Sequence, residues 1–387
     1  MEKPFISKVV INNYRSIAHC DVQLGALQFL VGRNGSGKSN FLDALAFVRD
    51  ALEFNDLGKA VYKTYARVWD ISHSQQKGEK LNFSMEIEFN LSDGANGVFG
   101  FHLVGTGFSY IVTKEFCRIE QGDESTEYET QNGVLSGNDS KLFPPVAHDR
   151  LYLQNMSAYD TFRPLYNALR TMGIYNFVPQ HVPTLDNTNS SSLLMPDGKN
   201  IAQVISELAD DAKNRIQEYL QLVVPDVCGF CFREVVERKG DKFLEFQHKA
   251  GKFPHESMSD GTMRALCVLT ALLQERKSDE NNYPVLIGIE EPETGLHASA
   301  VGVLLDAMME AADMRQVIIA THSAEMLDDR EIEIEQILPV EMKDAKTVIA
   351  PLENITKDML REHLTTVGEL LRQDHLQPES SSSAFDK

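Results

Sequence analysis

The sequence Gly32-Arg33-Asn34-Gly35-Ser36-Gly37-Lys38-Ser39 matches the pattern G-x-x-x-x-G-K-[ST] at every fixed position. It follows the compact apolar run Leu27–Val31 and precedes a helical pattern from Lys38 to about Glu53. Glycines let the backbone point consecutive N–H groups at an anion, and the helix N-terminus adds about half a positive charge there. Lys38 would neutralise the β- and γ-phosphates, and Ser39 would ligate Mg²⁺. This segment, extended by Asn40, therefore predicts a nucleoside triphosphate site.

Composition and charge limit the classes of protein to which the chain can belong. Of its 387 residues, 42% are hydrophobic, which suits a globular chain with at least two lobes and a large core. The 57 acidic residues exceed the 37 basic ones and leave a formal charge of −20, which disfavours a surface devoted to nucleic acid or anionic lipid. The apolar runs are too short to cross a bilayer, the first residues lack a signal pattern, and the five cysteines are sparse. We therefore expect a cytoplasmic chain without membrane association.

The distribution of apolar residues predicts a mixed α/β chain. Strands are expected at Phe5–Tyr14, Asp21–Val31, Leu81–Leu91 and Gly100–Glu120, followed by an exposed hairpin tip or loop over Gln121–Ser140. Helical spacing appears over Ala158–Met172 and Asn200–Val223, and from Ser257 helices alternate with buried strands, which is typical of a parallel sheet. The predicted divisions are an N-terminal lobe (1–150), a helical insertion (151–225), a C-terminal lobe (226–376) and a disordered tail (377–387).

Two adjacent carboxylates, Glu290 and Glu291, follow the buried strand Val285–Ile289. Beside a triphosphate such a pair suits two tasks, because one carboxylate can orient Mg²⁺ and the other can accept a proton from an attacking water. The alternative, that both are solvated loop acids, loses weight once the glycine-rich loop is present.

Two weaker patterns flank this pair. The apolar strand Gln316–Ala320 ends in Thr321-His322-Ser323, where His322 can sense a γ-phosphate or serve as an ordinary structural histidine. Upstream, Ser259 and Gly261 open a helix, and a second anion site explains them as well as a simple N-cap does. The order of the motifs along the chain favours the functional interpretation of both patterns.

That order resembles the ABC ATPases, and within them the branch that contains the SMC and RecF proteins. The opening Ile11–Ser16 is similar to the Asn-Phe-Arg-Ser start of that branch. Met195–Asn200 and Thr366–Arg372 fit its compact AAA15/AAA21 group, several members of which serve bacterial anti-phage systems. Transport-type relatives usually carry Asp-Glu and Gly-Gly where this chain has Glu290-Glu291 and Asp260-Gly261. The resemblance implies an ABC-ATPase head with an antiparallel β lobe, a parallel RecA-like lobe and an inserted helical lid.

The resemblance also implies a role for each matching residue. Lys38, Glu291 and the switch histidine His322 would be catalytic, with ATP and Mg²⁺ as cofactors, and Glu290 would join Ser39 at the metal. Ser259 and Gly261 would contact the γ-phosphate of ATP on a second subunit, so that ATP holds together a homodimer or higher oligomer. The loop Thr294–His297 would cross that seam. Gln154 is the candidate for the glutamine that contacts Mg²⁺ and water, and Arg15 for a contact to the base or phosphates.

Three functions compete at this point. The first is an ATP-driven switch that controls a nuclease-like effector protein in anti-phage defence or genome maintenance. It rests on the short segment after His322, which is too small for the appended Toprim-type nuclease of the overcoming-lysogenization-defect relatives. The second is a RecF-like DNA-binding clamp in recombinational repair, which the charge of −20 does not help. The third, a transporter ATPase, is disfavoured by the carboxylate pair and the signature variant.

Overall fold

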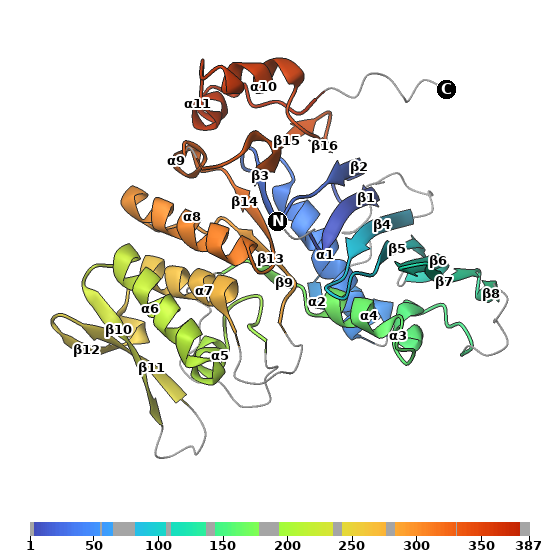
Figure 1. The fold of residues 1–387 in the computed structure, drawn as a ribbon, viewed down its shortest axis with the longest axis horizontal. Helices are drawn as coiled ribbons and strands as arrows, with labels where there is room; N and C mark the ends of the chain where they lie inside the picture. Colours follow the sequence, from blue (N-terminus) through green and yellow to red (C-terminus); the bar gives the residue numbers. More distant parts are fainter. Residues whose placement is uncertain are drawn as a thin grey trace.

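The computed structural model describes residues 4–54, 56–64, 82–105, 110–136, 144–177, 193–234, 242–275, 283–329 and 331–379. Within these residues the strands form three sheets, of seven, six and three strands, called here the antiparallel, central and small sheets. The central sheet lies between the other two (Figure 1).

The antiparallel sheet arises from strands that alternate buried and exposed residues, as in β4, where Phe83, Met85, Ile87 and Phe89 are buried. Its strands in order are β2 (Ile17–Gln23), β1 (Ile6–Tyr14), β4 (Asn82–Asn90), β5 (Asn96–Gly105), β6 (Tyr110–Gln121), β7 (Glu124–Gln131) and β8 (Val134–Ser136). The prediction of an exposed hairpin tip or loop over Gln121–Ser140 is confirmed as a hairpin at its start, where an exposed two-residue turn joins β6 to β7, but strands β7 and β8 then continue to Ser136. Residues 137–140 lie outside the described residues.

The inner strands of the central sheet are buried on both faces. In order it contains β16 (Lys346–Ile349), β15 (Ile337–Lys343), β3 (Leu27–Val31), β14 (Gln316–Thr321), β13 (Leu286–Glu290) and β9 (Gly173–Tyr175). All neighbours are parallel except the β15–β16 hairpin. The prediction of one strand over Asp21–Val31 is wrong: β2 ends at Gln23, and β3 begins at Leu27 in the other sheet.

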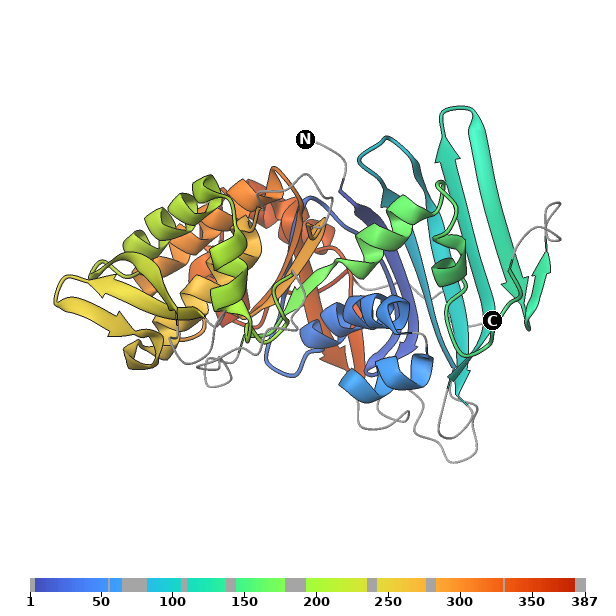
Figure 2. The same ribbon diagram turned by 90° about the horizontal axis from the view of Figure 1, so that it is seen from below.

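Helices cover both faces of the central sheet, so that two hydrophobic cores share it. Phe29 of β3 faces one core and Leu30 the other. On one face α1 contacts β9 and β14 of the central sheet and also β1 of the antiparallel sheet, so α1 lies between the two sheets (Figure 2). On the other face, α7 and α8 contact the sheet, and α6 packs on both. The described helices between residues 38 and 312 are α1 (Lys38–Glu53), α2 (Leu57–Thr64), α3 (Leu153–Met156), α4 (Arg163–Arg170), α5 (Ile201–Glu207), α6 (Asp210–Val223), α7 (Asp260–Leu273) and α8 (Ala298–Ala312).

The segment predicted as a helical insertion, 151–225, contains α3 to α6, but it also contributes strand β9 to the central sheet. The small sheet follows it, with β10 (Val227–Glu234), β11 (Lys242–His248) and β12 (Gly251–Pro254). Three further helices close the chain: α9 (Ala324–Leu327), α10 (Asn354–Arg361) and α11 (Val367–Arg372).

The predicted disordered tail begins too early. Pro378 pairs with Leu352, and the Glu379 N–H donates to the Pro351 carbonyl at 2.8 Å. Residues 380–387 lie outside the described residues. In the described part of the chain, each helix is too short or too polar to span a bilayer.

Candidate nucleotide-binding site

The central sheet brings the carboxyl ends of four neighbouring parallel strands to one edge. β3 leads into the glycine-rich loop, β14 ends beside His322, β13 ends at Glu290 and β9 ends beside Asn176. Ligands of open α/β sheets bind at this edge because the loops that follow the strands converge there. Motifs that lie far apart in the sequence therefore form one site.

The glycine-rich loop adopts backbone conformations that favour glycine. Gly35 has a φ of 80° and Gly37 a φ of 106°, both in the left-handed region, where a side chain would strain the backbone. Helix α1 begins directly after Gly37, so its free N–H groups and the positive end of its dipole face the loop. This is the local geometry of a phosphate-binding site.

Lys38 carries the positive charge of the loop. Its Nζ donates hydrogen bonds to the carbonyl oxygens of Gly32 at 2.7 Å and Arg33 at 3.1 Å, and lies 3.6 Å from Glu291 Oε1. Burial lowers the pKa of Lys38, and the charge of Glu291 opposes that shift. The ammonium group is thus held inside the loop, where it can exchange backbone acceptors for phosphate oxygens.

Two side chains meet at one oxygen of Glu290. Ser39 Oγ donates to Glu290 Oε2 at 2.7 Å, and Asn176 Nδ2 donates to the same atom at 3.3 Å. Burial raises the pKa of Glu290, and the Ser39 hydrogen bond partly offsets this effect. Hydroxyl, carboxylate and amide oxygens are the hard ligands that Mg²⁺ prefers, so these residues fit that cation. Asn176 was not predicted, because it follows a three-residue strand and no motif marks it.

Glu291 turns back toward the loop through an unusual backbone conformation. Its φ is 44°, in the left-handed region, and its N–H donates to the Ala320 carbonyl of β14 at 2.8 Å. Its carboxylate hydrogen-bonds His322 Nδ1 through Oε2 and faces Lys38 through Oε1. Such strained positions concentrate at functional sites. The carboxylate is therefore oriented by a histidine on one side and an ammonium on the other, as a positioned general base requires.

A third carboxylate, Glu293, lies beside this pair and was not assigned a role from the sequence. Its Oε1 accepts a hydrogen bond from Thr321 Oγ1 at 2.5 Å. Ligand atoms of Glu291, Glu293 and His322 all lie within 4.8 Å of one another. Burial, with a smaller effect from the charge of Glu291, raises the pKa of Glu293 to about 7. Glu293 can therefore gain or lose a proton near neutral pH next to Glu291.

Arg264 ties the start of α7 to the carboxylate pair, and it too was missed. Its side chain is buried, and its guanidinium donates to the Glu290 carbonyl at 2.9 Å and to the Glu291 carbonyl at 2.7 and 3.0 Å. A further hydrogen bond reaches the carbonyl of Phe177, one residue after Asn176. The rigid fork of donors thus fixes the ends of β9 and β13 together. Sequence pattern gives no sign of this role, because the partners are backbone atoms.

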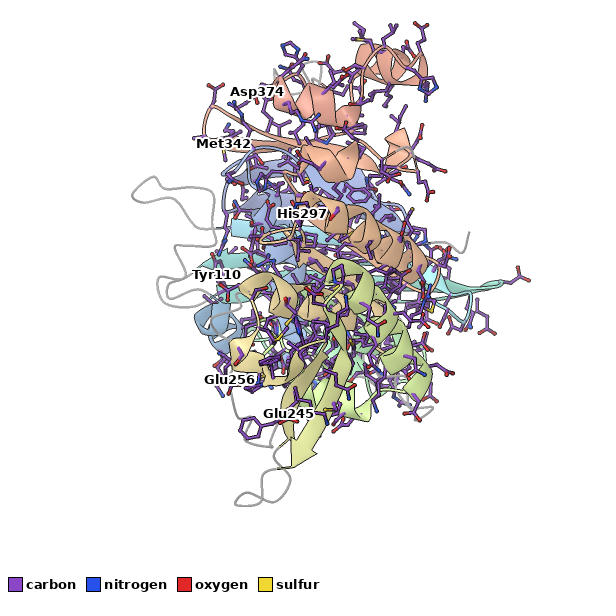
Figure 3. The ribbon with its side chains drawn as sticks, turned by 90° about the vertical axis from the view of Figure 1, so that its left-hand side faces the viewer. Tyr110, Glu245, Glu256, His297, Met342 and Asp374 are labelled. Atoms are coloured by element: carbon purple, nitrogen blue, oxygen red, sulfur yellow. The ribbon has the colours of Figure 1, made fainter. Side chains whose placement is uncertain are left out.

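The predicted signature residues lie at the start of α7, where Ser259 is exposed and Gly261 is buried. Ser259 is the N-cap, with Oγ accepting from the Thr262 N–H at 3.2 Å, as the simpler interpretation predicted. A Cβ at Gly261 would lie 2.2 Å from the Gly295 carbonyl oxygen, so the loop Thr294–His297 requires glycine there. His297, which caps α8, is also exposed (Figure 3). The two elements form one surface that a second subunit can approach.

The prediction that Gln154 contacts Mg²⁺ is wrong. Its Nε2 donates to the carbonyl oxygens of Ala51, Leu52 and Phe54, which end α1. The 16 residues of α1 span about 24 Å, and the glycine-rich loop lies at the other end of that helix. Gln154 is therefore a C-terminal cap of α1, and Asn176 is the amide that the fold brings to Glu290 instead.

The remaining predicted residues surround the loop. Arg15 has a φ of 48° and donates to Asn40 Oδ1 at 3.2 Å and to Asp43 Oδ2 at 2.5 Å, which keeps it beside the first turn of α1. Arg33 and Asn34 are both exposed. The side chain of Arg33 is 76% exposed and forms an ion pair of 2.5 Å with Asp374.

A family model matches most of the chain. It is AAA_21, described as "AAA domain, putative AbiEii toxin, Type IV TA system", and it matches residues 27–328. The match includes the glycine-rich loop, the start of α7, the carboxylate pair and His322.

Individual relatives match with low sequence identity. The Old nuclease of Escherichia phage P2 is 22% identical over 357 residues, which are 83% of this chain and 57% of that protein. The DNA replication and repair protein RecF of Actinobacillus succinogenes is 28% identical over 102 residues, 23% of this chain and 28% of RecF. The chain therefore spans less than two thirds of the length of either relative.

A solved structure agrees with the fold. The SMC head bound to the C-winged helix domain of ScpA is 18% identical, and the match covers 92% of this chain and 100% of that chain with a TM-score of 0.51. The predicted combination of an antiparallel lobe with a parallel-sheet lobe, as in an ABC-ATPase head, is confirmed.

Proposed function

Because this chain belongs to the AAA_21 family and is an ABC-type ATPase of the SMC and RecF kind, we propose that it binds ATP with Mg²⁺ and hydrolyses the γ-phosphate. One observation carries this proposal: Lys38, Ser39 and the pair Glu290-Glu291 meet at a single edge of the central sheet. The loop supplies a phosphate site, and the two carboxylates supply distinct chemical tasks beside it.

The division of labour follows from the contacts. Backbone N–H groups of the loop and the Lys38 ammonium hold the phosphates, while Ser39 and Glu290, with Asn176, would hold Mg²⁺. When bound, the cation neutralises charge on the phosphate oxygens. Glu291 accepts the proton of the attacking water, and His322 keeps its carboxylate in place through the Nδ1 contact.

We further propose that two copies close around ATP. The exposed Ser259 and the start of α7 would complete the site of a second copy, with Thr294–His297 beside the seam. A helix N-terminus with an exposed hydroxyl suits the γ-phosphate. Loss of that phosphate on hydrolysis removes the contact and loosens the dimer.

The test combines two variants. Glu291→Gln should retain ATP binding, lower phosphate release by about 10²–10⁴-fold and elute as a dimer in ATP on size-exclusion chromatography. Adding Ser259→Arg should return that variant to a monomer, whereas Ser125→Arg, at an exposed position of β7, should not. Phosphate release from Glu291→Gln at the rate of the parent chain would remove Glu291 from the proposed role.

We propose that the ATP-dependent dimer controls a separate effector protein, nuclease-like in character, in bacterial anti-phage defence or genome maintenance. The likeness to the Old nuclease supports this choice. Affinity purification of the Glu291→Gln form with ATP should capture such a partner, and Lys38→Ala should not. Metal-dependent DNA cleavage by the purified chain alone would contradict a separate effector.

The match to RecF supports a second candidate, a clamp that binds DNA directly. The formal charge of −20 weighs against it, because contacts to phosphates need a basic surface. ATP turnover that rises with DNA and falls steeply with salt would favour the clamp over the effector switch.

A further inference from the structure

Thr347 lies directly behind the glycine-rich loop, although it belongs to the C-terminal hairpin β15–β16 and is far away in sequence. Its side chain is 2% exposed, and its Oγ1 donates to the Ser36 carbonyl oxygen at 2.9 Å. A Cβ at Gly37 would lie only 1.9 Å from Thr347 Oγ1, so β16 and the loop are in direct contact. Neither β16 nor Thr347 was predicted as part of the site.

The hydroxyl of Thr347 is the last link of a directed chain of hydrogen bonds. Asn40 Nδ2 donates to Ser16 Oγ, and Ser16 Oγ lies 2.6 Å from Thr347 Oγ1. Because a hydroxyl has one proton and Thr347 gives its proton to Ser36, Ser16 must be the donor between the two hydroxyls. The Thr347 N–H also donates to the Ser16 carbonyl at 2.7 Å. Ser16 and Thr347 are therefore fixed to each other through both backbone and side chain.

The chain has a consequence for the peptide between Ser36 and Gly37. In a trans peptide the C=O and the following N–H point in opposite directions. With the Ser36 carbonyl held by Thr347, the Gly37 N–H is directed away from β16. That side of the loop carries the start of α1, where N–H groups await an anion.

We propose that Thr347 is a positioning residue for the triphosphate, which fixes the Ser36–Gly37 peptide so that the Gly37 N–H faces the phosphates. Ser16, in the segment that resembles the start of the SMC and RecF branch, fixes Thr347 in turn. The proposal rests on the proposed ATP binding. It also gives Ser16 a role that does not require Ser16 to contact the nucleotide.

Thr347→Val removes the hydroxyl and nearly keeps the volume of the side chain. Without its partner the Ser36 carbonyl is free to rotate, and we expect the Kd for a non-hydrolysable ATP analogue with Mg²⁺ to rise about 10-fold in calorimetry. Because the Gly37 N–H binds ground state and transition state alike, KM should rise by a similar factor while kcat stays within about twofold. Thr347→Ser keeps the hydroxyl and should restore both values.

Thr171→Val is the matched control. Thr171 is a buried threonine whose hydroxyl donates to the Asn167 carbonyl at 2.8 Å, outside the site, so its loss costs stability without touching the loop. Ser16→Ala interrupts the same chain one link earlier and serves if Thr347→Val does not fold; it should also weaken nucleotide binding.

Equal affinity in Thr347→Val and the parent, or equal weakening by Thr171→Val, would overturn the positioning role while leaving ATP binding intact. Failure of the parent chain to bind the analogue would instead overturn the proposed function, and this inference with it.

Discussion

Ser39 and Glu290 are joined by a hydrogen bond of 2.7 Å across 251 positions of sequence. The bond exists because β3 and β13 both end at the same edge of the central sheet, on either side of β14. A cation held by both oxygens would replace that hydrogen bond with two metal contacts. Metal binding at this pair would therefore be linked to the alignment of the loop with the carboxylates.

Glu290→Gln tests this link. The amide can still meet Ser39, but it lacks the charge that attracts Mg²⁺. We expect the Mg²⁺ concentration for half-maximal binding of a fluorescent ATP analogue to rise about 10-fold, with little change in the affinity measured in EDTA. An unchanged Mg²⁺ requirement would remove Glu290 from the metal site.

Asn176 and Gln154 form a natural pair of variants, because the structure gives Asn176 the place beside Glu290 that was predicted for Gln154 from the sequence. Asn176→Ala should raise the Mg²⁺ requirement in the same titration, since it removes the amide beside Glu290. Gln154→Ala should leave that requirement unchanged and lower the melting temperature, since three carbonyls at the end of α1 lose their donor. The reverse outcome would restore Gln154 to the metal site.

The contrast between these two residues explains how far sequence alone can reach. The loop, α1 and the carboxylate pair are predictable because local pattern and chemistry coincide at Lys38, Ser39 and Glu290. Asn176 follows a strand of three residues, too short for periodicity to detect, and its partner lies 114 positions away. Arg264 binds backbone carbonyls, which leave no trace in the sequence of the partner segment. Tertiary contacts of this kind appear only once the strand order is known.

Lys38→Ala should abolish measurable binding of the ATP analogue in calorimetry. The variant removes the only charge that the contacts place inside the described loop, because Arg33 is turned to Asp374. Lys59→Ala, at an exposed position of α2, is the control and should bind normally. Normal affinity in Lys38→Ala would contradict the phosphate-site assignment.

Arg264→Ala should uncouple binding from hydrolysis. Without the guanidinium, the carbonyls of Glu290 and Glu291 lose three hydrogen bonds in total, and the left-handed turn at Glu291 loses part of its support. We expect kcat to fall at least about 10-fold while the Kd for the analogue changes by less than about threefold. Arg163→Ala provides the comparison, because Arg163 also donates to two carbonyls, those of Ser157 and Ala158, at an exposed position outside the site. An equal loss of kcat in both variants would mean that Arg264 acts on stability alone.

The buried carboxyl group of Glu115 should make the stability of the chain depend on pH, whether or not nucleotide is bound. This carboxyl is fully buried in β6, where its oxygens accept from Tyr128 Oη at 2.7 Å, the Tyr152 N–H at 2.5 Å and the Leu153 N–H at 2.7 Å. Burial nevertheless raises its pKa to about 7, above the usual value of 4.5. Between these two values the folded state binds more protons than the unfolded state, so the free energy of unfolding falls as the pH rises.

The contribution of Glu115 is complete below pH 4.5 and is lost as the pH rises through about 7. We expect urea denaturation of the parent chain to lose roughly 2–3 kcal/mol more between pH 5 and pH 8 than that of Glu115→Gln. The variant should also be less stable at pH 5, because its amide opposes one of the N–H donors. Glu127→Gln changes an exposed carboxylate paired with Arg118 and should follow the parent at both pH values. Identical pH profiles for the parent and Glu115→Gln would mean that Glu115 has an ordinary pKa in the folded chain.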